Sequence, residues 1–127
     1  NHYIDKLGNI EGIKIPSIVS DIDTGHSWNQ FVIRILDNDK SSIADKGNKR
    51  DLFKLELQKY GVNTIIYYPI PIHLQPAYQK FGYVEGYLPI TEKICKQVIS
   101  LPIFPELNFV QQSYVVDIIK NIYKKNF

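Results

Sequence analysis

Apolar and polar side chains alternate most regularly over residues 28–36, and this period of two predicts a strand. One face of the strand carries three apolar residues that we expect to lie on the core: Phe31, Ile33 and Ile35. Residues 62–68 are rich in β-branched and aromatic side chains and predict a second strand. Residues 13–20 contain apolar positions interrupted by Pro16, a pattern typical of an irregular or edge strand.

Apolar side chains at helical spacing predict helices over residues 2–7, 49–60, 92–99 and 109–124. The first is expected to be the last turn of a helix, ended by Gly8 and Asn9. The apolar stripe of the second contains Phe53, Leu57 and Tyr60. The stripe of the last helix steps by four residues: Val110, Tyr114, Ile118 and Ile122.

Capping residues indicate where these helices begin and end. Asn48 is a suitable N-cap for the helix over 49–60, and Gly61 is expected to end it. Thr91 is predicted to cap the helix over 92–99. Asn108 and Gln111 form a pair close to the capping-box pattern at the start of the last helix.

The order of these elements predicts an α/β (α+β) fold, with a small, mainly antiparallel sheet and helices packed on it. The length of 127 residues indicates a single domain over 1–127. Apolar residues make up 44% of the chain, which is enough for a core and argues against disorder. No methionine occurs, so we expect the chain to be a piece of a longer protein.

Charge and cysteine content exclude several classes of function. The net charge of +2 gives no basic field of the kind that binds nucleic acid. No apolar run is long enough to span a membrane. The single cysteine, Cys95, suits a reducing compartment, and we expect a cytoplasmic protein in which Cys95 is a small core residue.

Short motifs add little chemistry. The chain has no P-loop, no GxGxxG and no HExxH. Its three histidines, His2, His26 and His73, are too far apart to indicate a metal site, and we predict none. Asp39 lies in a polar loop over 37–49 that lacks the glycine and glutamate offsets of a calcium loop. Arg34, in the middle of a strand, is expected to pair with a carboxylate.

Residues 67–78 form a stretch that three prolines hold in a rigid, irregular conformation. The residues alone leave two interpretations open. In one, the prolines turn the chain, Tyr67 and Tyr68 fill the edge of the core, and His73 satisfies a backbone carbonyl. In the other, the stretch faces a ligand: tyrosines stack on a flat face, His73 binds a phosphate or hydroxyl, and Gln75 binds an amide or hydroxyl.

Several segments, in order and with their spacing, resemble one known family. They are HSWNQFVIR at 26–34, GVNTIIYYPIPIHLQPAY at 61–78 and LPITEKICKQVISLPIFPEL at 88–107. The chain resembles the C-terminal domain of the DegT/DnrJ/EryC1/StrS family, the pyridoxal-phosphate-dependent sugar aminotransferases. The resemblance implies a small domain of aspartate-aminotransferase-like fold, in a homodimer whose N-terminal domain holds pyridoxal phosphate (PLP) and the catalytic lysine.

The resemblance also implies a function for the stretch. Members transfer an amino group from glutamate to a keto group on a nucleotide-linked sugar, which the proline-rich loop helps to contact. Carried over by position, Tyr67, Tyr68, His73 and Gln75 are substrate-binding residues, although Tyr67 stands where the family usually has histidine. Catalytic residues would lie in the N-terminal domain, so this chain alone is expected to be inactive.

Two further expectations concern the substrate and the alternative. The HLQPAY segment is more similar to family members that act on 3-keto sugars than to those that act on 4-keto sugars. We expect the sugar to be linked to dTDP or UDP. The alternative is a non-catalytic nucleotide-sugar-binding or dimerisation module that works alone.

Overall fold

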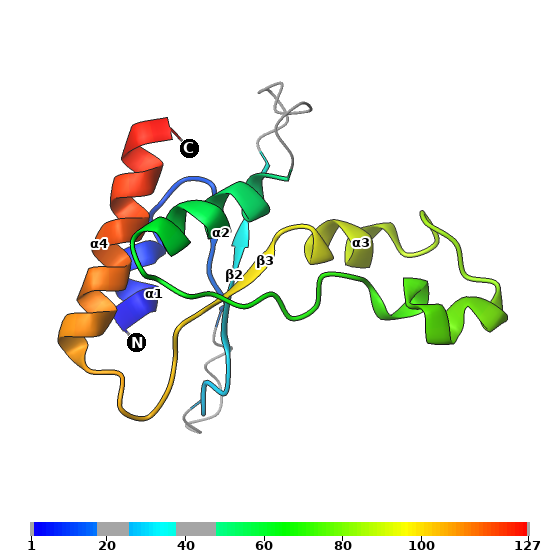
Figure 1. The fold of residues 1–127 in the computed structure, drawn as a ribbon, viewed down its shortest axis with the longest axis horizontal. Helices are drawn as coiled ribbons and strands as arrows, with labels where there is room; N and C mark the ends of the chain where they lie inside the picture. The colour runs from blue at the N-terminus through cyan, green and yellow to red at the C-terminus, as the bar shows by residue number, and fades with distance from the viewer. Residues whose placement is uncertain (1, 18–25, 38–47, 127) are drawn as a thin grey trace.

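A computed structural model describes residues 2–17, 26–37 and 48–126 of the chain. Figure 1 shows a body of helices and strands, from which one long segment extends to the side and returns. The helices and strands follow in the order α1 (His2–Leu7), β1 (Ile13–Lys14), β2 (Phe31–Ile35), α2 (Lys49–Lys59), the 3₁₀ helices η1 (Ile72–Leu74) and η2 (Pro76–Phe81), α3 (Pro89–Cys95), β3 (Val98–Leu101) and α4 (Phe109–Asn126).

The three strands form an antiparallel sheet in the order β1-β2-β3. β1 pairs Ile13 with Ile35, and β3 pairs Ile99 with Ile33, so β2 is the central strand. Helix α2 contacts β2, β3 and α4, and α1 lies beside α4 (Figure 1). The predicted fold class is therefore confirmed. The strand predicted over 13–20 is an edge strand, but it covers only Ile13 and Lys14, and residues 18–20 lie outside the described residues.

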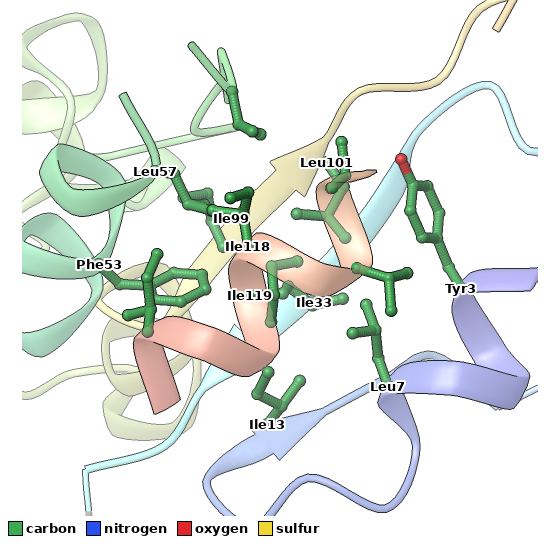
Figure 2. Packing of buried hydrophobic residues seen from close by; sticks show 14 of the residues in the cluster. Tyr3, Leu7, Ile13, Ile33, Phe53, Leu57, Ile99, Leu101, Ile118 and Ile119 are labelled. Atoms are coloured by element: carbon green, nitrogen blue, oxygen red, sulfur yellow. The ribbon is translucent and has the colours of Figure 1, made fainter. Parts of the chain in front are cut away.

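One hydrophobic cluster joins the sheet to the helices (Figure 2). The alternation in β2 buries the three side chains that the sequence predicted: Phe31, Ile33 and Ile35. Phe53 and Leu57 enter the cluster from α2, and Ile119 enters it from α4; all three are fully buried. The cluster contains no residue between Val62 and Ile99, so the extending segment contributes nothing to it.

Local capping signals are confirmed at two helices. The Asn48 side chain accepts a hydrogen bond from the amide of Arg50 at 2.9 Å, and Gly61, with φ of 73°, follows the end of α2. Asn108 and Gln111 make the reciprocal pair of a capping box, with distances of 3.1 and 2.9 Å.

The predicted helix over 92–99 is wrong at both ends. Thr91 makes no cap, because α3 already begins at Pro89, a favoured residue at the first helical position. Val98 and Ile99, which the helical spacing assigned to this helix, lie in β3. All four residues of β3 are buried beside β2, and this pairing overrides the helical spacing.

The predicted strand over 62–68 is also wrong. Only Ile65 pairs with the sheet, through an isolated bridge in which its N–H and C=O bond to Ser100 at 3.2 and 2.7 Å. The chain then leaves the sheet and runs into the prolines at 69 and 71, which remove the backbone donors that a longer ladder would need.

Two of the predicted apolar stripes contain residues that lie outside the core. Tyr60 is 42% exposed, and its carbonyl accepts a hydrogen bond from the hydroxyl of Tyr114 at 2.9 Å. Val110 and Tyr114 are also exposed, and both line a cavity instead of joining the core. The core face of α4 begins at Val115.

The expected partner of Arg34 is wrong as well. Its guanidinium donates two hydrogen bonds to the side-chain oxygen of Gln97, at 3.1 and 2.7 Å, and that residue is an amide rather than a carboxylate. Asp39, and most of the polar loop predicted over 37–49, lie outside the described residues.

Candidate functional site

Residues 65–96, here called the arm, form the segment that leaves the body in Figure 1. Its outgoing leg carries the prolines and η1, its tip contains η2, and its returning leg contains α3. The described residues outside it are here called the body. The proline-locked stretch 67–78 thus lies along one leg and the tip of a projection.

The arm displays its apolar side chains instead of burying them. At least 38% of the surface of each of the following is exposed: Ile65, Tyr67, Tyr68, Ile70, Ile72, Tyr78, Phe81, Tyr83, Val84, Tyr87, Leu88 and Ile90. So many exposed apolar side chains on one segment mark an interaction or ligand site more often than a corner of a core. The interpretation in which Tyr67 and Tyr68 fill the core edge is therefore wrong.

A groove of about 550 Å³ lies between the legs of the arm. Aromatic rings from all parts of the arm line it: Tyr67, Tyr68, Tyr78, Phe81 and Tyr83. The imidazole of His73 also lines it and meets the ring of Tyr83 edge to face, with centroids 6.2 Å apart. Such a site offers flat faces for stacking and few polar groups.

The legs are joined by a buried pair, His73 from η1 and Glu92 from α3. His73 is 6% exposed and Glu92 is 8% exposed. The Nε2 of His73 lies 3.0 Å from Oε1 of Glu92. The same carboxylate accepts hydrogen bonds from the backbone N–H of Gly86, at 2.8 and 3.0 Å to its two oxygens, and of Leu88 at 3.1 Å.

These contacts set the protonation of Glu92. The hydrogen bond from the Gly86 amide, with those of His73 and Leu88, lowers the pKa of the Glu92 carboxyl below its ordinary value, against the opposing effect of burial. Glu92 is therefore a carboxylate at neutral pH and only accepts hydrogen bonds. The Nε2 of His73 must accordingly carry the proton that it donates.

The base of the returning leg is anchored to α2. Arg50, which is 5% exposed, donates from Nη1 to the carbonyls of Cys95 and Val98, at 3.1 and 2.9 Å. Asn48 donates to the carbonyl of Lys96 at 2.7 Å. The N-terminus of one body helix thus fixes the point where the arm rejoins the sheet.

The predicted site residues are only partly brought together. Tyr67, Tyr68 and His73 all line the groove, whereas Gln75 does not. Gln75 is half-buried beside it, between η1 and η2. Tyr67 also lines a second cavity of about 820 Å³ against the body, next to Ser100 and Tyr114.

Sequence reasoning missed Glu92 and the rings of Phe81 and Tyr83. Glu92 was visible only as one acid near the start of a helix, and its partner His73 lies 19 residues earlier. Nothing in that spacing indicates contact. Phe81 and Tyr83 follow the proline-rich stretch, and Gly82 between them indicated only a turn, with no pattern that predicts ligand binding.

Cys95 also differs from its expected place. It is half-buried and lines the groove instead of joining the core cluster. Burial raises the pKa of its thiol, with a smaller opposing effect from Arg50, so it remains protonated at neutral pH.

The other two histidines lie away from the groove. The ring of His2 packs on Phe109 and lies 3.2 Å from the hydroxyl of Ser113. The exposed His26 stacks on Trp28 and accepts a hydrogen bond from its amide. Among the described residues, no three His, Cys, Asp or Glu side chains gather as metal ligands, and no helix could cross a membrane.

PLP does not fit the described residues. The cofactor needs a lysine amine to bind it as a Schiff base and charged groups to hold its phosphate and ring. Neither of the two cavities described above is lined by a lysine, an arginine, an aspartate or a glutamate. We therefore derive no reaction step through PLP from these residues.

Solved structures of other proteins share this fold. S. venezuelae DesV, crystallised in complex with a ketimine intermediate, matches with a TM-score of 0.82 and 31% identity over 99% of this chain and 30% of that chain. A DegT DnrJ EryC1 StrS aminotransferase from Brucella abortus matches with a TM-score of 0.76 and 27% identity, over 98% of this chain and 29% of that chain. The fold is thus one found within aminotransferases.

Sequence comparison gives the family. The model of the DegT/DnrJ/EryC1/StrS aminotransferase family matches residues 1–120, and the chain belongs to that family. It is 34% identical to dTDP-3-amino-3,4,6-trideoxy-alpha-D-glucose transaminase of Streptomyces venezuelae, over 93% of this chain and 27% of that protein. It is 49% identical to a "Pleiotropic regulatory protein" of Geobacillus stearothermophilus, over 78% of this chain and 23% of that protein. The chain therefore spans about a quarter of the length of these curated relatives.

Proposed function

We propose that these residues form the C-terminal, substrate-facing domain of a nucleotide-sugar aminotransferase. The intact protein transfers an amino group from glutamate to a keto group on a dTDP- or UDP-linked sugar. The 3-keto group is favoured over the 4-keto group as the acceptor. PLP and its lysine belong to an N-terminal domain outside these residues, so the 127-residue chain alone is inactive.

One observation carries this proposal: the likeness to a dTDP-sugar transaminase extends over 93% of the chain. Two more relatives have names of the same kind, a dTDP-3-amino-3,6-dideoxy-alpha-D-galactopyranose transaminase and a UDP-N-acetyl-3-dehydro-alpha-D-glucosamine 3-aminotransferase. All three names contain a nucleotide-linked sugar and a nitrogen at the 3-position, which supports the lean toward 3-keto substrates.

The shape of the arm is consistent with substrate binding. Its groove presents tyrosine rings whose faces suit a base or a sugar ring and whose hydroxyls suit ring oxygens and hydroxyls. In this proposal Tyr67 and Tyr68 contact the nucleotide-sugar directly. Gln75 would reach a polar group of the substrate from beside the groove, and His73 takes part from within it.

The proposal is tested with the intact polypeptide that contains these residues. It is mixed with PLP, glutamate and a dTDP- or UDP-linked 3-keto sugar, and amino-sugar product is measured by mass spectrometry. We expect turnover with the intact protein and none with the 127-residue chain. Absence of product with both nucleotides, and with 3-keto and 4-keto sugars alike, would reject the proposal.

A non-catalytic binding module is the second candidate, and one observation favours it. The relative at 49% identity has the name of a regulatory protein rather than of a transaminase. Borohydride reduction separates the two candidates. A PLP-modified lysine in the intact protein supports the enzyme, whereas binding of nucleotide-sugar without any trapped lysine supports the module.

The proposed assembly follows from the family resemblance. We expect the intact protein to be a cytoplasmic homodimer, and light scattering of the purified protein measures its mass directly. A monomer at micromolar concentration would contradict this expectation.

A further inference from the structure

We infer that Glu92 is the positioning residue of the arm: it holds the outgoing and returning legs together, so that the rings of the groove face the substrate. The inference rests on the proposed function for the identity of the ligand. It makes a separate claim about what fixes the site.

The first step is the number of partners that one carboxylate serves. Glu92 bonds to the imidazole of His73 on the outgoing leg and to the amides of Gly86 and Leu88 on the returning leg. Both of its oxygens are used. Hydrogen bonds to a charged acceptor are the stronger ones, and here they connect η1 on the outgoing leg with α3 and the turn that precedes it on the returning leg.

The second step is what else could hold the arm. His73 and Glu92 are the only buried residues between 65 and 96, and no residue of the arm belongs to the hydrophobic cluster. The apolar rings of the arm lie on its surface. Hydrophobic burial therefore contributes little to its shape, and the polar pair at its centre is the main tie between the legs.

The third step concerns His73. Its Nε2 donates to Glu92, so this nitrogen is not free for a phosphate or hydroxyl of the substrate. His73 then acts on substrate binding mainly through Glu92, by keeping η1 against α3. Removing either partner should open the groove by the same mechanism.

The arm offers a matched control. Glu85 lies next to Gly86 on the returning leg, but its side chain is 77% exposed and lies 3.7 Å from the Lys96 amine. Glu85→Gln and Glu92→Gln remove the same charge from the same leg. Only the second removes a buried acceptor.

Hydrogen–deuterium exchange of the intact protein tests whether Glu92 holds the two legs of the arm together, a role here called the clamp. In Glu92→Ala we expect the amides of Gly86 and Leu88 to exchange about tenfold faster or more, because they lose a charged acceptor. Exchange at Ile99, in the body, should not change. Glu92→Gln should give a smaller increase, and Glu85→Gln none. Unchanged exchange at Gly86 and Leu88 in Glu92→Ala would overturn the inference.

Steady-state kinetics test positioning. We expect Glu92→Ala to raise KM for the keto sugar about tenfold, while KM for glutamate and PLP content stay unchanged. His73→Ala should raise it similarly, and the double variant should add little to either single variant. Faster exchange with an unchanged KM, or additive effects in the double variant, would overturn the positioning role.

The two proposals fail separately. If the wild-type protein shows no aminotransfer to any nucleotide-sugar, the proposed function is rejected while the exchange result still reports on the clamp. If the wild type is active but Glu92→Ala exchanges and turns over like it, only the inference is rejected.

Discussion

The body and the arm are both rich in apolar side chains, but only the body buries them. In the body, Phe53 and Ile119 are inaccessible, and the sheet and helices meet through them. In the arm, Phe81 and Tyr68 are each 60% exposed, and the buried residues are a histidine and a glutamate. The body is stabilised by apolar packing, whereas the arm is held by hydrogen bonds that leave its rings available to a ligand.

Substitution of two phenylalanines, one in the body and one in the arm, should give the largest difference in stability between the two regions. Phe53→Ala should lower the free energy of unfolding by about 3–5 kcal/mol, because it leaves a cavity in the core. Phe81→Ala should change it by less than about 0.5 kcal/mol, because that ring is exposed. The protection of the Ile99 and Ile119 amides in native-state exchange of the intact protein measures both. Similar losses in the two variants would contradict the division into body and arm.

A variant that fails to fold is replaced by a milder one. Phe53→Leu should cost less than about 1.5 kcal/mol and still exceed the effect of Phe81→Leu. Calorimetry of the Phe81→Ala protein should show weaker nucleotide-sugar binding than the wild-type protein.

Arg50 connects the two regions, and its removal should have the next largest effect. Arg50→Met leaves the carbonyls of Cys95 and Val98 without their donor and should cost about 1–3 kcal/mol. The control is Lys59→Met, which breaks an exposed pair with Glu56 and should cost no more than about 0.5 kcal/mol. Equal effects would show that the anchor at the base of the arm adds nothing.

A capping residue gives a smaller effect that is confined to the body. Asn108→Ala removes the side-chain acceptor of the Gln111 amide and should lower stability by about 1 kcal/mol. Asn121→Ala, at an exposed position inside α4, serves as the control and should not destabilise. Exchange at Gly86 should be the same in both variants, and a change there would mean that the arm depends on α4.

Acid should open the arm with the least effect on the body. The pKa of Glu92 is lowered by folding, so its contribution is complete above the ordinary carboxyl pKa and is lost as pH falls through the folded value. NMR shifts of the Gly86 and Leu88 amides should follow this loss. Glu92→Gln should abolish the transition, and its persistence in that variant would assign it to another group.

Buried tyrosines give the body a different pH response. Burial raises the pKa of Tyr3, whose hydroxyl donates to the carbonyl of Pro102, to about 12. It also raises that of Tyr123. Deprotonation at high pH is therefore resisted in the body, whereas the response of the arm lies on the acid side.

The elements that could be predicted from the sequence are those whose signals are local. The alternation in β2, the cap at Asn48 and the reciprocal pair at Asn108 and Gln111 each depend on neighbours within a few residues. The three prolines of 67–78 correctly indicated a segment outside α-helix and sheet, although it contains the 3₁₀ helix η1 and the start of η2, which the sequence did not predict. Three of the four predicted site residues line the groove.

The remaining features depend on contacts between distant residues. Val98 and Ile99 fit the helical spacing predicted over 92–99 but lie in β3, because β2 is there to pair with them. Arg34 finds Gln97, and Glu92 finds His73, only after the chain has folded back. No periodicity in the sequence carries that information, since each partner is a single residue on a different element.

The attachment of the arm also has a consequence for the outer edge of the sheet. A strand with unpaired backbone groups can recruit a strand from another molecule and start aggregation. On β3, the N–H and C=O of Ser100 are taken by Ile65, and the C=O of Val98 is taken by Arg50. One residue of an irregular segment and one guanidinium thus protect this edge against edge-to-edge growth, without a fourth strand among the residues that the structure describes.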